Sequence, residues 1–278
     1  MRISRLSAVL VAALLLTAIP APSLAQVSVG ATIGMPPPPL PVYAQPPAPE
    51  ANYQWNPGYW GWGTVGYYWV PGTWAPAPRR GLYWTPGYWR HSGAGYGWNQ
   101  GFWGPSVGFY GGVNYGYGYF GTGFVGGIWA GSNFRYNTAV ANVNRAVIRN
   151  TYVDKTVVTK NIYSDRVSYN GGRGGISARP TSGQMAATQQ GVPPTVNQRQ
   201  QATIAGQDRN LYASVNKGNP RVTAVAKPFS STNRPANSAP VTTADRRSMQ
   251  KEEKPAQRPS ANKAAGSQRK PAHAQPPA

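Results

Sequence analysis

Aromatic residues dominate the hydrophobic positions of residues 53–105, where they recur in four copies of one short pattern. The pattern Trp-x-Pro-Gly-x-Trp begins at Trp55, Trp69 and Trp84, and a degenerate copy without proline begins at Trp98. The leading tryptophans are 14, 15 and 14 residues apart, and the glycines of the copies keep that spacing. Four copies in register indicate an internal repeat rather than an accident of a glycine-rich composition.

Each Pro-Gly pair is predicted to form a tight turn. Proline presets the first central position of a type II turn, and glycine supplies the positive φ of the second. With such a two-residue loop, the two tryptophans of one copy face each other across a hairpin. Because type II turns match strand twist less well than primed turns, we expect the hairpins to splay or bulge. The predicted turn residues are Pro57, Gly58, Pro71, Gly72, Pro86, Gly87 and Gly101, and the predicted pairs are Trp55/Trp60, Trp69/Trp74, Trp84/Trp89 and Trp98/Trp103.

Four hairpins in succession predict a mainly β fold, a meander that presents the eight tryptophans on one face. The residues two positions before each leading tryptophan share that face; they are Tyr53, Tyr67, Leu82 and Tyr96. The face is either the core of a small sheet or an exposed aromatic platform for sugars and other planar ligands. The core interpretation is favoured because a segment of about 50 residues has few other large side chains from which to build a core.

A glycine- and aromatic-rich extension follows at residues 106–134, and a β-prone stretch at 135–169. Tyrosine alternates with glycine over residues 115–119, so a strand here would have rings on one face and bare backbone on the other. The alternatives for the extension are a loop or further strands, a self-association segment, and a transmembrane strand, which is disfavoured because one or two strands cannot close a barrel. The β-prone stretch predicts two or three strands, or a short helix at residues 139–149.

The first 25 residues have the features of a secretory signal peptide. Two arginines precede an apolar run at residues 8–19, which is too short to span a bilayer, and Ser23-Leu24-Ala25 is a small-x-small cleavage site. Cleavage after Ala25 predicts a mature chain that starts at Gln26; the alternative is an N-terminal membrane anchor. No second apolar run of transmembrane length follows, so we expect the mature chain to be exported without a transmembrane segment.

Proline-rich and basic segments flank the repeats. Residues 26–52 form a proline-rich leader, interpreted as an extended polyproline II spacer or, alternatively, as a docking peptide for an aromatic groove. Residues 170–278 carry 16 Lys and Arg against 4 Asp and Glu, a net charge of +12. Because large apolar residues are sparse there, most of this C-terminal tail is predicted to be disordered, with local helices at 195–206 and 244–253.

The composition excludes most catalytic chemistry. The chain has no cysteine, so thiol catalysis, disulfides and a lipid-anchored cysteine are ruled out. Its two histidines, His91 and His273, are far apart in sequence, which argues against a zinc site. No Asp or Glu lies between Ala51 and Val153, so the aromatic region holds no carboxylate pair. We therefore expect a non-enzymatic protein with no cofactor and no metal.

The charge balance points to anionic partners. The chain has 27 Lys and Arg against 7 Asp and Glu, a net charge of +20, of which +18 remains once the two signal arginines are removed. A polybasic tail attracts polyanions with little specificity. For an exported chain these are acidic polysaccharide, lipopolysaccharide or another polyanion; the alternative is charge that serves solubility alone. The signal peptide and the lack of an RNP1-type motif argue against an RNA-binding protein.

The repeats, together with residues 108–116, resemble the WXXGXW (YXWGXW) repeat proteins, also described as BcpO-related. The similarity runs roughly from Tyr53 to Pro228, and the fourth copy departs from the pattern at Gln100, where proline is usual. The resemblance implies an exported proteobacterial protein of the periplasm, outer-membrane surface or extracellular space, and no catalytic residue. Two hypotheses follow: a non-enzymatic envelope or extracellular-matrix protein whose basic tail contacts anionic polymers, or a carbohydrate-binding module that uses exposed Trp and Tyr rings.

Overall fold

The computed structural model describes residues 32–121, 123–156, 166–235 and 237–247 of the chain. Within these residues the protein is mainly β, built from short strands and hairpins, as the repeats predict. The predicted signal peptide and its cleavage site at Ala25 lie outside the described residues, as do residues 248–278.

The first two repeats form one long hairpin, residues 53–76. Its outgoing arm contains β2 (Tyr53–Asn56) and β3 (Tyr59–Gly63), and its returning arm contains β4 (Gly66–Val70) and β5 (Gly72–Pro76). β3 pairs with β4 and β2 with β5, both antiparallel, so that Trp60 lies opposite Trp69 and Trp55 opposite Trp74. The chain reverses between β3 and β4.

Repeats three and four form a second long hairpin, residues 83–104, with the same layout. Its arms are β6 (Tyr83–Thr85) with β7 (Tyr88–Ser92), and β8 (Gly95–Asn99) with β9 (Phe102–Gly104). Trp89 lies opposite Trp98, and Trp84 lies opposite Trp103. Each hairpin therefore joins two neighbouring copies of the repeat.

The predicted pairing of tryptophans within one copy is wrong, and so is the prediction that the Pro-Gly pairs are hairpin turns. The pairs are kinks inside the arms: the strands end before Pro57, Pro71 and Pro86 and resume in the same register beyond them. Proline removes a donor from the ladder, which explains the interruption without a reversal. Among the glycines of the four copies, Gly58, Gly72, Gly87 and Gly101, none has a positive φ. Glycine is required at these four positions for a steric reason, because a β-carbon there would lie only 2.3–2.6 Å from a tryptophan ring atom.

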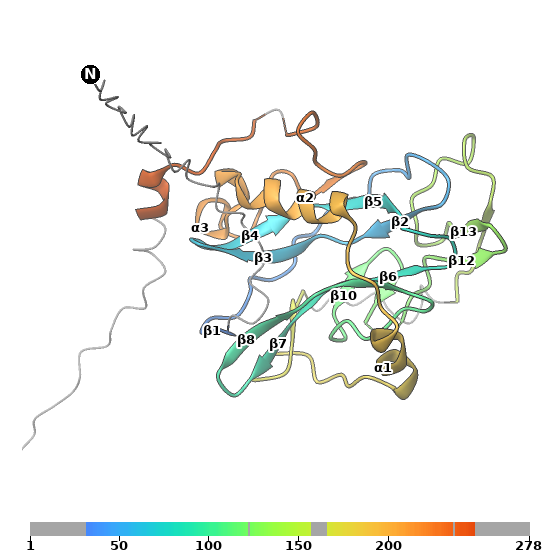
Figure 1. Cartoon of the computed structure of the whole chain (residues 1–278), viewed down its shortest axis with the longest axis horizontal. Helices are drawn as coiled ribbons and strands as arrows, with labels where there is room; N and C mark the ends of the chain where they lie inside the picture. Colours follow the sequence, from blue (N-terminus) through green and yellow to red (C-terminus); the bar gives the residue numbers. More distant parts are fainter. Residues whose placement is uncertain (1–31, 122, 157–165, 236, 248–278) are drawn as a thin grey trace, which may run out of the picture.

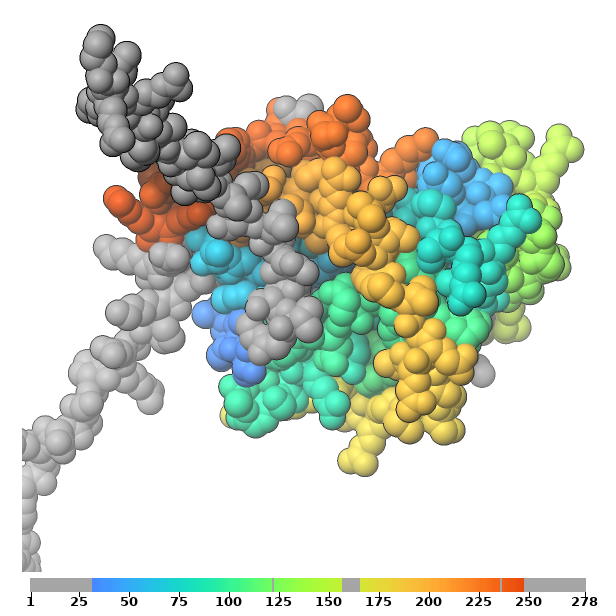
Figure 2. Space-filling view, in the orientation of Figure 1, coloured from blue at the N-terminus to red at the C-terminus, as the bar shows by residue number. Residues whose placement is uncertain are grey.

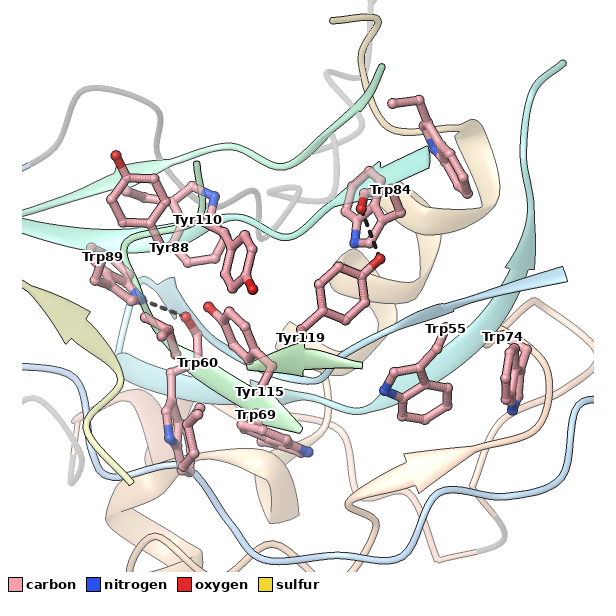
Figure 3. Packing of buried hydrophobic residues seen from close by; sticks show 14 of the residues in the cluster. Trp55, Trp60, Trp69, Trp74, Trp84, Tyr88, Trp89, Tyr110, Tyr115 and Tyr119 are labelled. Atoms are coloured by element: carbon pink, nitrogen blue, oxygen red, sulfur yellow. Dashed lines mark hydrogen bonds between the residues drawn. The ribbon is translucent and has the colours of Figure 1, made fainter. Parts of the chain in front are cut away.

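The two hairpins lie one above the other, with the aromatic core between them (Figures 1 and 3). The indole N–H of Trp89 donates to the carbonyl of Trp60 at 2.8 Å, and the side-chain amide of Gln54 donates to the carbonyl of Leu82 at 2.6 Å. These hydrogen bonds cross between the hairpins, so the two units form one core rather than two successive domains.

The glycine- and aromatic-rich extension fills the space between the hairpins. It contains β10 (Asn114–Gly116) and β11 (Tyr119–Phe120), and it continues into β12 (Gly127–Ala130). The hydroxyl of Tyr115 donates to the carbonyl of Gly87 at 2.6 Å, and that of Tyr119 to the carbonyl of Trp84 at 2.8 Å. Figure 3 shows both rings inside the aromatic cluster. Of the alternatives for this segment, further strands is the one that the structure supports.

The β-prone stretch contributes one central strand and two edge strands to small sheets. β13 (Asn133–Asn137) lies between β12 and β14 (Thr151–Tyr152), and β15 (Tyr169–Asn170) pairs with β7. The expected two or three strands are therefore confirmed. Residues 139–149 form turns rather than the alternative short helix, and residues 157–165 lie outside the described residues.

The described part of the proline-rich leader packs against the core, so its interpretation as a spacer is wrong there. β1 (Thr32–Ile33) pairs with β8. The carbonyl of Pro39 accepts a hydrogen bond from the indole of Trp60 at 3.1 Å, and that of Pro46 accepts one from Trp74 at 2.8 Å. Consecutive prolines keep the chain extended with its carbonyls available, which suits buried indoles that need acceptors. The alternative, a docking peptide for an aromatic groove, stays a prediction; the described segment contacts the aromatic core of its own chain.

Much of the C-terminal tail is folded onto the hairpins, in contrast to the expected disorder for residues 170–247. The residues coloured yellow to orange in Figure 2 lie over the hairpins. The helix α2 (Val196–Gly206) packs on β4 and β3, and the carbonyl of Thr223 accepts a hydrogen bond from the indole of Trp69 at 2.9 Å. The elements of this part are α1 (Ser182–Gln189), α2 (Val196–Gly206), the 3-10 helix η1 (Arg209–Leu211), α3 (Ala213–Asn216) and β16 (Ala224–Val225).

Of the two helices expected in the tail, the one at 195–206 is confirmed as α2. Its N-cap is Thr195, whose side chain accepts from the backbone N–H of Gln198, while the Gln198 side chain accepts from the N–H of Thr195. This capping box satisfies two otherwise unpaired donors. The second expected helix, 244–253, is helical over residues 243–247, and the remainder lies outside the described residues.

Candidate functional site

The predicted aromatic face is the core of the protein. None of its eight tryptophans is more than 6% exposed. The four cross-strand pairs have ring centroids 5.2–5.4 Å apart, with planes inclined by 55–67°. This edge-to-face or tilted arrangement is the favoured geometry for aromatic pairs. The residues are Trp55, Trp60, Trp69, Trp74, Trp84, Trp89, Trp98 and Trp103.

Hydrogen bonds inside the protein use most of the indole N–H groups of this core. Trp103, for example, donates to the side-chain oxygen of Gln198 at 2.8 Å, and Trp98 donates to that of Gln100 at 3.2 Å. A sugar platform needs rings with a face open to solvent. The eight repeat tryptophans are not such a platform, and the hypothesis that they form one is corrected by their burial.

The buried tyrosines are held neutral. Burial raises the pKa of Tyr115 and of Tyr119 well above the ordinary tyrosine value, and burial likewise raises that of Tyr110. Their hydroxyls serve as donors to backbone carbonyls. A general base needs a pKa near the working pH, so these groups are structural. Among the residues that the structure describes, no cluster of three or more His, Cys, Asp or Glu could hold a metal ion.

The surface of the described residues is strongly cationic. Every Lys and Arg in them is exposed. Two ion pairs involve described side chains: Lys227 with Glu50 at 2.9 Å, and Arg209 with Asp245 at 3.0 Å. Hydrogen bonds from Thr156 lower the pKa of Asp154, so this acid also carries its charge. Most of the surface cations nevertheless have no acidic partner within the described part of the chain.

The cations are unevenly distributed along the sequence. The repeats carry only Arg79 and Arg80, in the connection between the two hairpins, and Arg90 on β7. The remaining described cations belong to residues 135–156, 166–235 and 237–247, parts of which lie over the hairpins in Figure 2. Sequence reasoning located this charge but placed most of it on a disordered segment, whereas residues 170–247 hold it on a folded surface.

A pocket that the sequence did not predict lies where the kinks of both hairpins meet α2. Its volume is about 350 Å³. Prolines contributed by the kinks and by the segment before α2 form much of its wall, together with the rings of Tyr59, Trp84 and Trp98. The variable positions of the repeat carry the signal that could have pointed to it, because Asn56 and Thr73 place polar groups beside the kinks. The lining prolines are Pro57, Pro71, Pro86, Pro193 and Pro194.

Comparison with protein-family models, with curated proteins and with solved structures gave no match. The resemblance to the WXXGXW repeat proteins therefore stays a prediction. Among the described residues, none of the helices has both the length and the apolar character needed to cross a membrane.

Proposed function

We propose that this protein is a non-enzymatic, exported component of the cell envelope or extracellular matrix that binds anionic polymers. The observation that supports the proposal most directly is the exposed set of Lys and Arg side chains on the folded surface, most of which have no acidic partner among the described residues. The aromatic core is a rigid support for this surface. Its eight tryptophans are used for packing, which leaves the basic exterior as the main contact region.

Many weak contacts explain how such a surface would bind. At physiological ionic strength the screening length is about 8 Å, so one isolated exposed cation contributes little. A flexible polyanion that touches several cations together releases several counterions, and the affinity then falls steeply with salt. Acidic polysaccharide, lipopolysaccharide and DNA share this chemistry, and dispersed cations do not distinguish among them by shape.

The predicted export determines which polyanion is relevant. An exported chain meets lipopolysaccharide phosphates and acidic polysaccharide before it meets nucleic acid. Fractionation of cells that express a tagged copy would assign it to the periplasm, the outer-membrane surface or the medium. Recovery of the full-length, unprocessed chain in the cytosol would contradict this part of the proposal.

Binding of the mature chain to immobilised acidic polysaccharide, lipopolysaccharide and DNA across a salt series tests the proposal. The slope of log affinity against log salt should be clearly negative for each polymer. Arg246 and Arg247 offer a matched pair of variants: replacement by Gln removes two exposed charges, whereas replacement by Lys keeps them. The Gln variant should bind more weakly with a shallower slope, and the Lys variant should bind as the wild type does. Equal binding by both variants at all salt concentrations, or affinity independent of salt, would reject the proposal.

A further inference from the structure

The pocket at the kinks has a polar rim and an apolar interior. Gln100, Pro193 and Arg199 are the exposed residues of its lining. Arg199 is the charged residue among them, so a ligand that enters meets a cation at the mouth and apolar surface inside. The buried prolines and indoles of the lining are Pro57, Pro71, Pro86, Pro194, Trp84 and Trp98.

Arg199 is held at the rim by the chain itself. Its guanidinium donates to the carbonyl of Pro194, which also belongs to the lining. Within the described part of the chain, Arg199 forms no ion pair with an acidic side chain. A guanidinium has five N–H donors in a planar fork that matches the geometry of a carboxylate. Arg199 therefore offers a positioned contact for an anion.

The start of α2 adds positive electrostatic potential at the same place. The first turn of the helix and the segment before it contribute Pro193, Pro194, Gln198 and Arg199 to the lining. That turn contains no acidic residue, and the N-terminal end of a helix dipole carries a partial positive charge. No Asp or Glu is among the described residues that line the pocket. The guanidinium and the dipole together favour a negatively charged ligand.

Two further donors of the lining are open to a ligand. The indole N–H of Trp84 and the hydroxyl of Tyr59 have no hydrogen-bond partner in the described chain, and neither atom is among its enclosed polar atoms. Burial raises the pKa of Tyr59, so this hydroxyl keeps its proton. The unpaired atoms of Asn56 and Thr73, in contrast, are enclosed by the protein and take no part in the site. The donors that a ligand can reach suit oxygen acceptors.

The interior wall favours a compact apolar body. Besides the buried prolines it contains Tyr59 stacked on Trp98, with ring centroids 4.8 Å apart and planes inclined by 20°. The volume of about 350 Å³ lies at the lower end of the range for small-molecule sites, which suits one substituted ring. An inorganic anion would leave this space unfilled. A ligand with many hydroxyls would leave most of them unpaired against proline, which is costly.

We infer that this pocket binds a small organic carboxylate, with the carboxylate on Arg199 and one apolar ring between the prolines. The ligand's charge is opposite to that of the rim, and its ring matches the interior wall. The inference goes beyond the proposed polyanion binding, because it concerns one small ligand in one pocket rather than cations dispersed over the surface. Benzoate is the simplest probe, since it consists of one carboxylate and one aromatic ring.

The test is titration of the mature chain with benzoate, followed by calorimetry and by tryptophan fluorescence, since two indoles line the pocket. Three probes separate the parts of the ligand: acetate has the charge without the ring, benzamide has the ring without the charge, and glucuronate has the charge on a polar ring. Benzoate should bind with saturable heat at millimolar concentration or below. Its affinity should exceed that of each other probe by at least about tenfold, since a hydrogen bond to a charged group and burial of an aromatic ring each contribute roughly that factor.

Variants of Arg199 test where benzoate binds. Arg199→Gln removes the charge and should lower benzoate affinity at least about tenfold. Arg199→Lys keeps the charge but lacks the planar fork, so its affinity should lie between those of the wild type and the Gln variant. Arg90→Gln is the matched control, because Arg90 is exposed on β7 and outside the lining; its benzoate affinity should stay within twofold of wild type. Both arginines are exposed, so all three variants should melt within a few degrees of the wild type.

Three results would overturn the inference. They are the absence of saturable benzoate binding at millimolar concentration, a benzoate affinity no higher than that of acetate, benzamide or glucuronate, and unchanged benzoate affinity in Arg199→Gln. Preference for glucuronate would assign the pocket to a sugar acid instead, and equality with acetate would show a surface ion pair without a pocket. Failure of polyanion binding would not affect any of these measurements, so the two proposals can fail separately.

Discussion

The indole of Trp69 covers Gly58 of the neighbouring repeat, so closely that a β-carbon at Gly58 would lie 2.3 Å from Cζ2 of Trp69. The reciprocal contact is equally close, with 2.5 Å between a β-carbon at Gly72 and Cζ2 of Trp55. The second hairpin repeats the arrangement with Trp98 over Gly87 and Trp84 over Gly101. The leading tryptophan of each copy therefore requires the glycine of its partner copy. Tryptophan and glycine recur together in the motif because two copies fold as one unit.

Replacement of Gly58 by Ala should destabilise the protein by about 1–3 kcal/mol, the usual cost of forcing an extra carbon into a packed core. The added carbon would meet the Trp69 ring and also the backbone nitrogen of Gly72 at 2.9 Å, and backbone cannot move aside as a flexible side chain can. The change in the free energy of unfolding can be measured by urea denaturation of the mature chain.

Gly97→Ala, on β8, is the matched control. A β-carbon there meets no atom within 4 Å, and the φ of Gly97 is not positive. This variant should be neutral or up to about 1 kcal/mol more stable, since alanine restricts the unfolded chain. If both variants had the same stability, the steric account of the motif glycines would be wrong.

A double-mutant cycle can test which tryptophans are partners. Trp55 and Trp74 have ring centroids 5.4 Å apart, so replacing both by Leu, singly and together, should give a coupling energy of about 0.5–1.5 kcal/mol. The same cycle on Trp55 and Trp60, which lie in one copy on the same arm, should give a smaller coupling. A larger coupling for Trp55 with Trp60 would favour a hairpin within each copy.

Local signals were sufficient to predict some elements of the fold. The repeat spacing and the β-prone aromatics predict a mainly β protein, and Pro193-Pro194 before Thr195 predicts the start of α2, because capping involves only residues close in sequence. The burial of the repeat tryptophans also followed from composition, since this region has few other residues from which to form a core.

Features that depend on distant residues could not be predicted in this way. Whether Trp55 faces Trp60 or Trp74 depends on where the chain reverses. The reversals are at residues 64–65 and 93–94, just before Gly66 and Gly95, whose φ values are +117° and +139°. The Pro-Gly pairs were the stronger turn signal by residue type, and it was misleading. The leader and the pocket depend on contacts between segments far apart in sequence, which a local pattern does not encode.

Alkaline pH should lower the stability of the folded protein through its buried tyrosines. Burial raises the pKa of Tyr68, Tyr115 and Tyr119 in the folded state above the value of about 10 that they have when unfolded. Above about pH 10 the unfolded chain therefore binds fewer protons than the folded chain, so stability falls as the pH rises. Below that pH these three groups make no contribution to the pH dependence.

Urea denaturation between pH 8 and pH 11.5 measures this effect. Tyr115→Phe removes one titrating group and should make the decline in stability above pH 10 shallower, although the variant is less stable at pH 8 because the carbonyl of Gly87 loses its donor. A stability profile that is flat to pH 11.5 would show that the tyrosines are accessible to solvent in the folded state.

Two truncations test whether the basic tail is part of the fold. A chain that ends at Asn170 loses α2 and the 16 Lys and Arg and 4 Asp and Glu of the tail together, a net charge of +12. It leaves the indoles of Trp69 and Trp103 without their acceptors and exposes Tyr68, which packs on Tyr212. Since exposure of one large buried side chain costs about 1.5–3 kcal/mol and whole domains are stable by only about 5–15 kcal/mol, this truncation should abolish cooperative unfolding.

A chain that ends at Arg247 should instead unfold cooperatively, with a melting temperature within a few degrees of the mature protein, because it keeps every contact between α2 and the hairpins. It also loses only six Lys and Arg and two Glu, a net charge of +4, so it should retain most of its salt-sensitive binding to acidic polymers. Limited proteolysis and thermal melts compare the folds of the two truncated chains, and a salt series compares the longer one with the full mature chain. Cooperative unfolding of the chain that ends at Asn170 would show that the hairpins fold without α2. Loss of polymer binding on removal of residues 248–278 would show instead that the cations of the folded surface do not form the contact region.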